Sequence, residues 1–150
     1  MAISAIFAFL HFSAVFGIFA IVFFERLTFS KALSFIEAKR IQVCDRWYGL
    51  CAVFVLMVGF LRIAYFEKGL TFYTTNTFFY AKITLFIIIG LLSTYPTVRF
   101  IKWSPALRQG IAPTVSAKAY KIISLILRTQ LILLFAIVLC ASFMARGVHF

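Results

Sequence analysis

Four ionisable side chains interrupt the long apolar stretches of this sequence, and they are the residues best able to do chemistry. They are His11, Arg62, Lys82 and Arg128. If those stretches cross a membrane, each of these groups is costly to bury, and we expect it to have a partner, a cavity or a ligand.

Three of them, His11, Arg62 and Lys82, fall toward the same predicted face of the membrane, with Arg146 nearby and only Glu67 as a neighbouring carboxylate. This excess of positive charge in a partly dry place favours an anionic, lipophilic ligand. A porphyrin such as haem b would meet that need, because His11 could ligate the iron while Arg62 and Lys82 hold the propionates.

Less specific interpretations of the same residues remain open. His11 could form a hydrogen bond across a helix contact, and Arg62 and Lys82 could extend to lipid phosphates, as long basic side chains do near helix ends. The other histidine, His149, follows the last apolar stretch. A second axial ligand would therefore come from Lys82, Met57, Met144, a water molecule or another protomer.

A second polar layer is predicted toward the opposite face. It contains Glu25, Asp45, Arg46 and Arg128, with Tyr48 and Tyr95 beside them. Its charges nearly balance, and an ion pair between Glu25 and Arg128 would join the first and last spans. We therefore expect a structural layer. The alternative, a proton or ion path, would need a further carboxylate near mid-membrane, which the sequence lacks.

The composition requires a membrane to hold these residues. The chain has 150 residues, of which 64% are hydrophobic and 13% charged, far from a soluble domain. Four apolar runs are long enough to cross about 30 Å of hydrocarbon as helices. We predict an all-α, four-helix transmembrane bundle in one domain, with spans over residues 2–24, 47–66, 77–98 and 122–145.

Helical phase predicts which face of each span is turned inward. At about 100° per residue, one stripe per helix contains the ionisable groups. The stripes are His11, Ile18, Val22 and Glu25; Tyr48, Val55 and Arg62; Lys82, Phe86, Ile89 and Ser93; and Arg128, Phe135, Ser142 and Arg146.

The net charge of +11 comes mainly from the first and third connections, so we predict that these are cytoplasmic and that both termini lie outside. Basic residues spread between apolar runs do not indicate nucleic-acid binding. Within the first connection, Glu25 to Arg46, residues 27–44 are predicted either as a short amphipathic helix on the lipid headgroups or as a solvated linker with helical propensity. The three cysteines are scattered, which excludes a disulfide framework and a zinc site. The sequence also lacks the motifs of nucleotide-binding proteins, zinc proteases and serine hydrolases, which excludes these enzyme classes.

Several segments together give the chain a resemblance to an uncharacterised family of four-span bacterial membrane proteins, domain of unknown function 2214. It is more distantly similar to HemJ, a haem-containing protoporphyrinogen oxidase, and to CopD-type copper-resistance proteins. The similarity to HemJ implies a haem-ligand role for His11 and a second site residue at Lys82. The segments are Leu10-His11, Trp47-Tyr48-Gly49, Gly59–Tyr73, Asn76–Lys82, Tyr95-Pro96 and Met144–Gly147.

We therefore expect a haem-binding protein of the bacterial inner membrane, with a possible oxidoreductase activity and a homodimer that shares the site. Two other classes stay open. One is a transport or binding protein for copper or a small anion, although paired soft ligands for copper are missing. The other is a non-catalytic assembly subunit.

Overall fold

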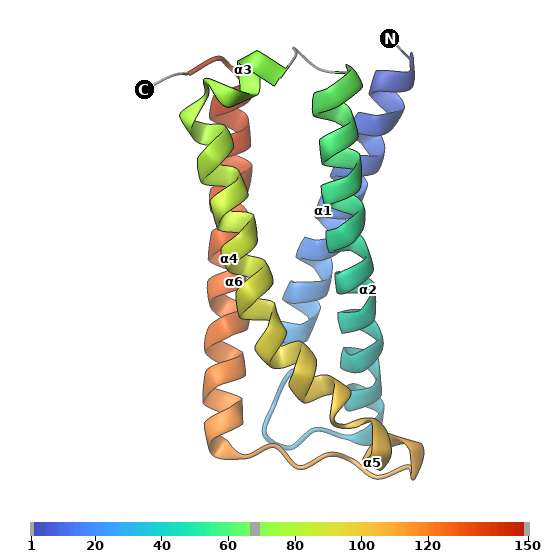
Figure 1. Cartoon of the computed structure of the whole chain (residues 1–150). Coiled ribbons are helices and arrows are strands. Elements are labelled where there is room, and N and C mark those ends of the chain that lie inside the picture. Colours follow the sequence, from blue (N-terminus) through green and yellow to red (C-terminus); the bar gives the residue numbers. More distant parts are fainter. Residues whose placement is uncertain (1, 67–69, 149–150) are drawn as a thin grey trace.

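Four long helices lie together as a bundle in the computed structural model, which describes residues 2–66 and 70–148 (Figure 1). Each of the four is long and apolar enough to cross a membrane, and the described residues contain no strand. The prediction of an all-α, four-helix membrane protein is confirmed. The long helices are α1 (Ala2–Thr28), α2 (Phe35–Leu61), α4 (Thr77–Ile101) and α6 (Ala117–Ala145).

Three short elements mark the two ends of the bundle. The π-helix η1 (Arg62–Phe66) continues α2 and is followed by α3 (Leu70–Thr74), whereas α5 (Ser104–Arg108) lies at the opposite end. We call these the α3 end and the α5 end. The start of α1 and the finish of α6 both lie at the α3 end (Figure 1), which is the end predicted to face outward.

Helix α2 begins well before its predicted span. Ser34 caps it: the Ser34 hydroxyl accepts a hydrogen bond from the Glu37 amide at 3.2 Å, and the Glu37 carboxylate accepts one from the Ser34 amide at 2.8 Å. This reciprocal pair is a capping box. The predicted helical character of residues 27–44 is confirmed for residues 35–44, which are the first turns of α2 and not a separate helix or a linker. Ala38 and Ile41 there are fully buried.

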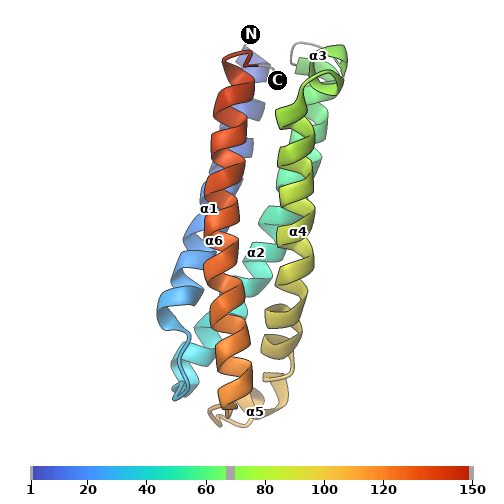
Figure 2. The ribbon, with the colours of Figure 1, turned by 90° about the vertical axis from the view of Figure 1, so that its left-hand side faces the viewer.

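The bundle consists of two closely packed helix pairs. Helix α1 packs mainly on α2, and α4 packs mainly on α6, with fewer contacts between the pairs. Figure 2 shows α6 and α4 in front of α1 and α2. Toward the α5 end, α4 leans across to α2 (Figure 1). Pro96 lies inside this part of α4, where a proline frees a backbone carbonyl and allows a helix to bend.

An aromatic cluster closes the α5 end. Phe29, directly after α1, is only 3% exposed. Its ring centroid lies 6.0 Å from that of Phe100, 6.4 Å from Trp103 and 5.8 Å from Tyr120. One phenylalanine thus connects the end of α1 with the end of α4 and the start of α6.

We expect Phe29→Ala to destabilise the protein strongly, because truncating a buried phenylalanine costs about 3–5 kcal/mol. Phe23→Ala is the matched control, since Phe23 belongs to α1 but is 54% exposed. Thermal unfolding in mild detergent should show a large decrease of the midpoint for Phe29→Ala alone. Equal effects of the two substitutions would contradict the role given to this cluster.

Candidate functional site

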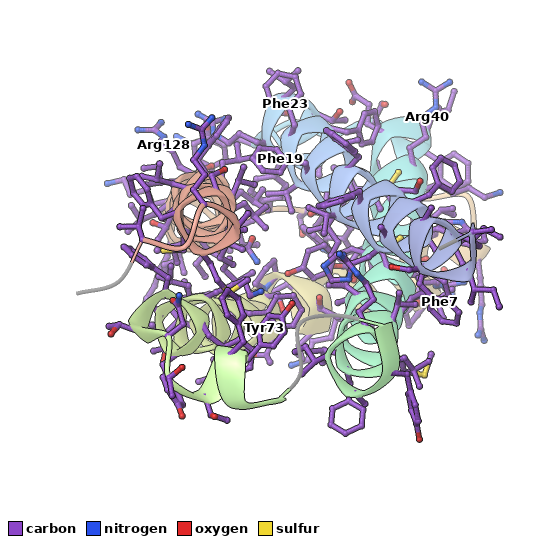
Figure 3. The ribbon with its side chains drawn as sticks, turned by 90° about the horizontal axis from the view of Figure 1, so that it is seen from above. Phe7, Phe19, Phe23, Arg40, Tyr73 and Arg128 are labelled. Atoms are coloured by element: carbon purple, nitrogen blue, oxygen red, sulfur yellow. The ribbon has the colours of Figure 1, made fainter. Side chains whose placement is uncertain are left out.

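The inward faces of three helices agree with the predicted stripes. Ile18, Val22 and Glu25 of α1 are buried, as are Tyr48 and Val55 of α2 and Ile89 of α4. The stripe on α6 is wrong. Its members Arg128, Phe135, Ser142 and Arg146 are exposed, and Figure 3 shows Arg128 pointing away from the bundle. The buried face of α6 instead contains Ile123, Ser124, Leu127, Gln130, Leu134 and Met144.

His11 is wedged between the two helices of the first pair. It is half-buried, and its Nδ1 atom is fully buried. A Cβ atom placed on Gly59 of α2 would lie 3.2 Å from Cε1 of His11 and 3.6 Å from Nδ1. The imidazole therefore packs directly on the α2 backbone, and the glycine at position 59 provides the space for it.

Arg62 and Lys82 are also half-buried near the α3 end. Each lies against an aromatic ring: the Arg62 guanidinium carbon is 5.4 Å from the centroid of Phe12, and the Lys82 Nζ is 5.7 Å from that of Phe79. Such contacts are favourable cation–π interactions. Arg62 belongs to the same helix pair as His11, whereas Lys82 belongs to α4.

The remaining predicted members of this group lie elsewhere. Arg146 is exposed at the end of α6. Of the proposed second ligands, Met57 is 54% exposed and Met144 is buried. Glu67 and His149 lie outside the described residues. The α3 end thus keeps its predicted basic character through Arg62 of the first helix pair and Lys82 of the second.

At the α5 end the predicted balanced layer is not formed. Glu25 and Asp45 are 3% and 6% exposed, whereas Arg46 and Arg128 are exposed. The predicted Glu25–Arg128 ion pair is wrong: Oε1 of Glu25 is buried and has no hydrogen-bond partner among the described residues. Arg128 points outward because it follows Leu127, the residue of α6 that faces the core. The core therefore contains two carboxyl groups, and Glu25 lies near Asp45.

Hydrogen bonds surround these acids and join the two helix pairs. The Thr97 hydroxyl of α4 donates to Oδ1 of Asp45 at 2.8 Å. The Gln130 amide of α6 donates to the Tyr48 hydroxyl at 3.4 Å. Gln42 donates to the Phe100 carbonyl at 2.8 Å and to the Ser104 hydroxyl at 2.9 Å. Polar side chains of α2 thus reach α4, α5 and α6.

A cavity of about 230 Å³ lies beside Asp45 and Tyr48, mainly between α2 and α4. One end is polar and the rest is apolar. Gly49 and Gly90 line it, and a Cβ atom on either would meet nothing within 4 Å. The other lining residues are Ile18, Ala52, Phe86, Ile89, Ser93, Thr94, Thr97 and Leu134.

The sequence reasoning missed Gln42, Gln130 and Thr97, because it considered only ionisable groups within the spans. Gln130 is 1% exposed. A signal existed, since Gln130 lies three residues after Leu127 and four before Leu134 and therefore shares their face. A neutral amide on an apolar helical face indicates a buried hydrogen bond as clearly as a charge does.

A family model described as "Predicted membrane protein (DUF2214)" matches residues 3–149. No curated protein and no solved structure matches the chain. The more distant similarities to HemJ and to CopD-type proteins therefore have no support from these comparisons.

The contact between His11 and Gly59 can be tested by adding volume to the glycine. We expect Gly59→Val to lower the free energy of unfolding by about 1–3 kcal/mol, the usual cost of overpacking. Gly49→Val on the same helix should have a much smaller effect, because its Cβ position is open. Denaturation in detergent compares them, and equal stabilities would contradict the packing of His11 on α2.

Proposed function

The chain belongs to the DUF2214 family of predicted membrane proteins, and we propose that it binds haem in the bacterial inner membrane, with His11 as an iron ligand. The observation that carries the proposal is the fixed imidazole between α1 and α2. The Nδ1 atom is buried against Gly59, so Nε2 is the nitrogen suited to ligation. An imidazole packed between two helices fits a proximal haem ligand.

The basic residues near the α3 end support an anionic ligand. Arg62 follows Gly59 by three residues, about 4.5 Å further along the helix axis. It therefore lies between His11 and the predicted outer surface, the side toward which haem propionates would point. Lys82 of α4 supplies a second cation at the same end. Paired cations of this kind bind carboxylates through charge-assisted hydrogen bonds.

Bound haem would supply one-electron chemistry, and a HemJ-like oxidoreductase is the activity that we propose for it. The protein's own part would be to orient the macrocycle with His11 and to hold its acid groups with Arg62 and Lys82. We further propose a homodimer, in which a second chain contributes to the enclosure of a ligand this large.

The test is the visible spectrum of protein purified in mild detergent from haem-replete cells. We expect a Soret band that His11→Ala removes and that His149→Ala, the control at the other histidine, retains. Arg62→Gln and Lys82→Gln should lower haem occupancy several-fold without moving the band, because they act on the propionates and not on the iron. Absence of a Soret band and of any porphyrin binding in the unchanged protein would overturn the proposal.

A further inference from the structure

A second site lies toward the other end of the bundle, away from His11. We propose that the cavity between α2 and α4 binds a lipophilic ammonium ion, the protonated form of an amine with an apolar or aromatic body. The ammonium group would be held by Asp45 and the neighbouring hydroxyl oxygens. The body would occupy the apolar part of the cavity.

The polar end of the cavity offers mainly acceptors, because three of its four hydroxyl groups already donate their protons elsewhere. The fourth, the Tyr48 hydroxyl, accepts from Gln130 and interacts with Ser93. Ser93 donates to the Gly90 carbonyl at 2.7 Å, and Thr94 donates to the Leu91 carbonyl at 2.7 Å. Thr97 donates to Asp45. A hydroxyl has one proton but two lone pairs, so each of these three oxygens can still accept. A ligand that is itself an acceptor, such as a carboxylate or a carbonyl compound, would find at most the Tyr48 hydroxyl as a donor here.

The acidic side chains near the cavity also favour a cationic ligand. Glu25 and Asp45 are buried side by side, and the described residues place no basic side chain in a salt bridge with either. Glu25 does not line the cavity, but it lies near Asp45 and Tyr48, which do. Buried charge favours a partner of opposite sign. A cation in the cavity would provide that partner, and an anion would be repelled.

The walls select a lipophilic cation over a hydrated ion. Phe86, Ile89 and Leu134 make most of the cavity surface apolar, and Phe86 and Tyr48 provide aromatic rings for an ammonium group or an aromatic body. An apolar cavity of about 150 Å³ holds benzene, so one of about 230 Å³ has room for a single ring with a short chain.

The cavity is reached from the bilayer. Its floor is formed by Ile18 of α1 and Leu134 of α6, while α2 and α4 form its sides. Gly49, Gly90 and Thr94 line it and are also exposed on the bundle surface. The opening therefore lies in the seam between α2 and α4, which faces lipid in the membrane.

Three probes that share one body can test the proposal: 4-phenylbutylamine, 4-phenylbutanol and 4-phenylbutyrate. Their binding to the full chain in lipid nanodiscs would be measured by equilibrium dialysis, with empty nanodiscs to correct for partitioning. We expect saturable binding of the amine at least tenfold tighter than that of the alcohol, and no saturable binding of the carboxylate. Equal affinities of amine and alcohol would overturn the proposal.

Two variants locate the binding. Asp45→Asn keeps the shape and an oxygen for Thr97 but removes the charge, and it should weaken amine binding at least tenfold while leaving the alcohol unchanged. Gly90→Leu should fill the cavity and abolish binding of both. Glu37→Gln is the matched control, because Glu37 lies on α2 outside the cavity and a glutamine can replace it in the capping box. Unaltered amine binding in both cavity variants would refute the site.

Discussion

The architecture depends on how three polar residues of one helix join two helix pairs. Gln42, Asp45 and Tyr48 of α2 each form a hydrogen bond to the opposite pair. In hydrocarbon, apolar surfaces have no preference for each other over lipid, so interhelical hydrogen bonds and close packing decide where helices meet. All three bonds lie toward the α5 end, and there α4 leans onto α2. The cavity lies beside Asp45 and Tyr48 and extends along the small residues Gly49 and Ala52.

The sequence predicts the faces of α1, α2 and α4 well because their inward stripes contain large apolar residues as well as polar ones. These stripes include the buried apolar residues Ile18 and Val22 on α1 and Val55 on α2. Their burial does not depend on the polar residues of the same stripe. The predicted inward face of α6 rests on Arg128 and Arg146, which lie on the same side of the helix but are both exposed. A long basic side chain can lie on a lipid-facing surface and extend to the headgroups. The position of a long basic side chain therefore says little about which face of a helix is buried. Gln130 cannot reach water in this way, and it does lie on the buried face of α6.

The start of α2 shows a different limit. Hydropathy detects only the part of a helix that lies in hydrocarbon, so it predicts a span from residue 47 and treats residues 27–44 as part of a separate connection. The helix begins at Phe35 because Ser34 and Glu37 cap it. This spacing of serine and glutamate is a capping-box pattern that can be recognised in the sequence. The cavity, in contrast, could not be predicted. It results from the relative tilt of α2 and α4, which depends on contacts between residues far apart in the chain.

The two ends of the bundle have opposite character, and an apolar layer separates them. His11 and Glu25 are fourteen residues apart on α1, about 21 Å along a helix. Between them lie Ile18 of α1, Val55 of α2 and Ile89 of α4, all buried. With this apolar layer between them, the two proposed ligands would reach their sites separately, and for the acidic end the seam between α2 and α4, where Gly49, Gly90 and Thr94 are exposed, is the route that we propose.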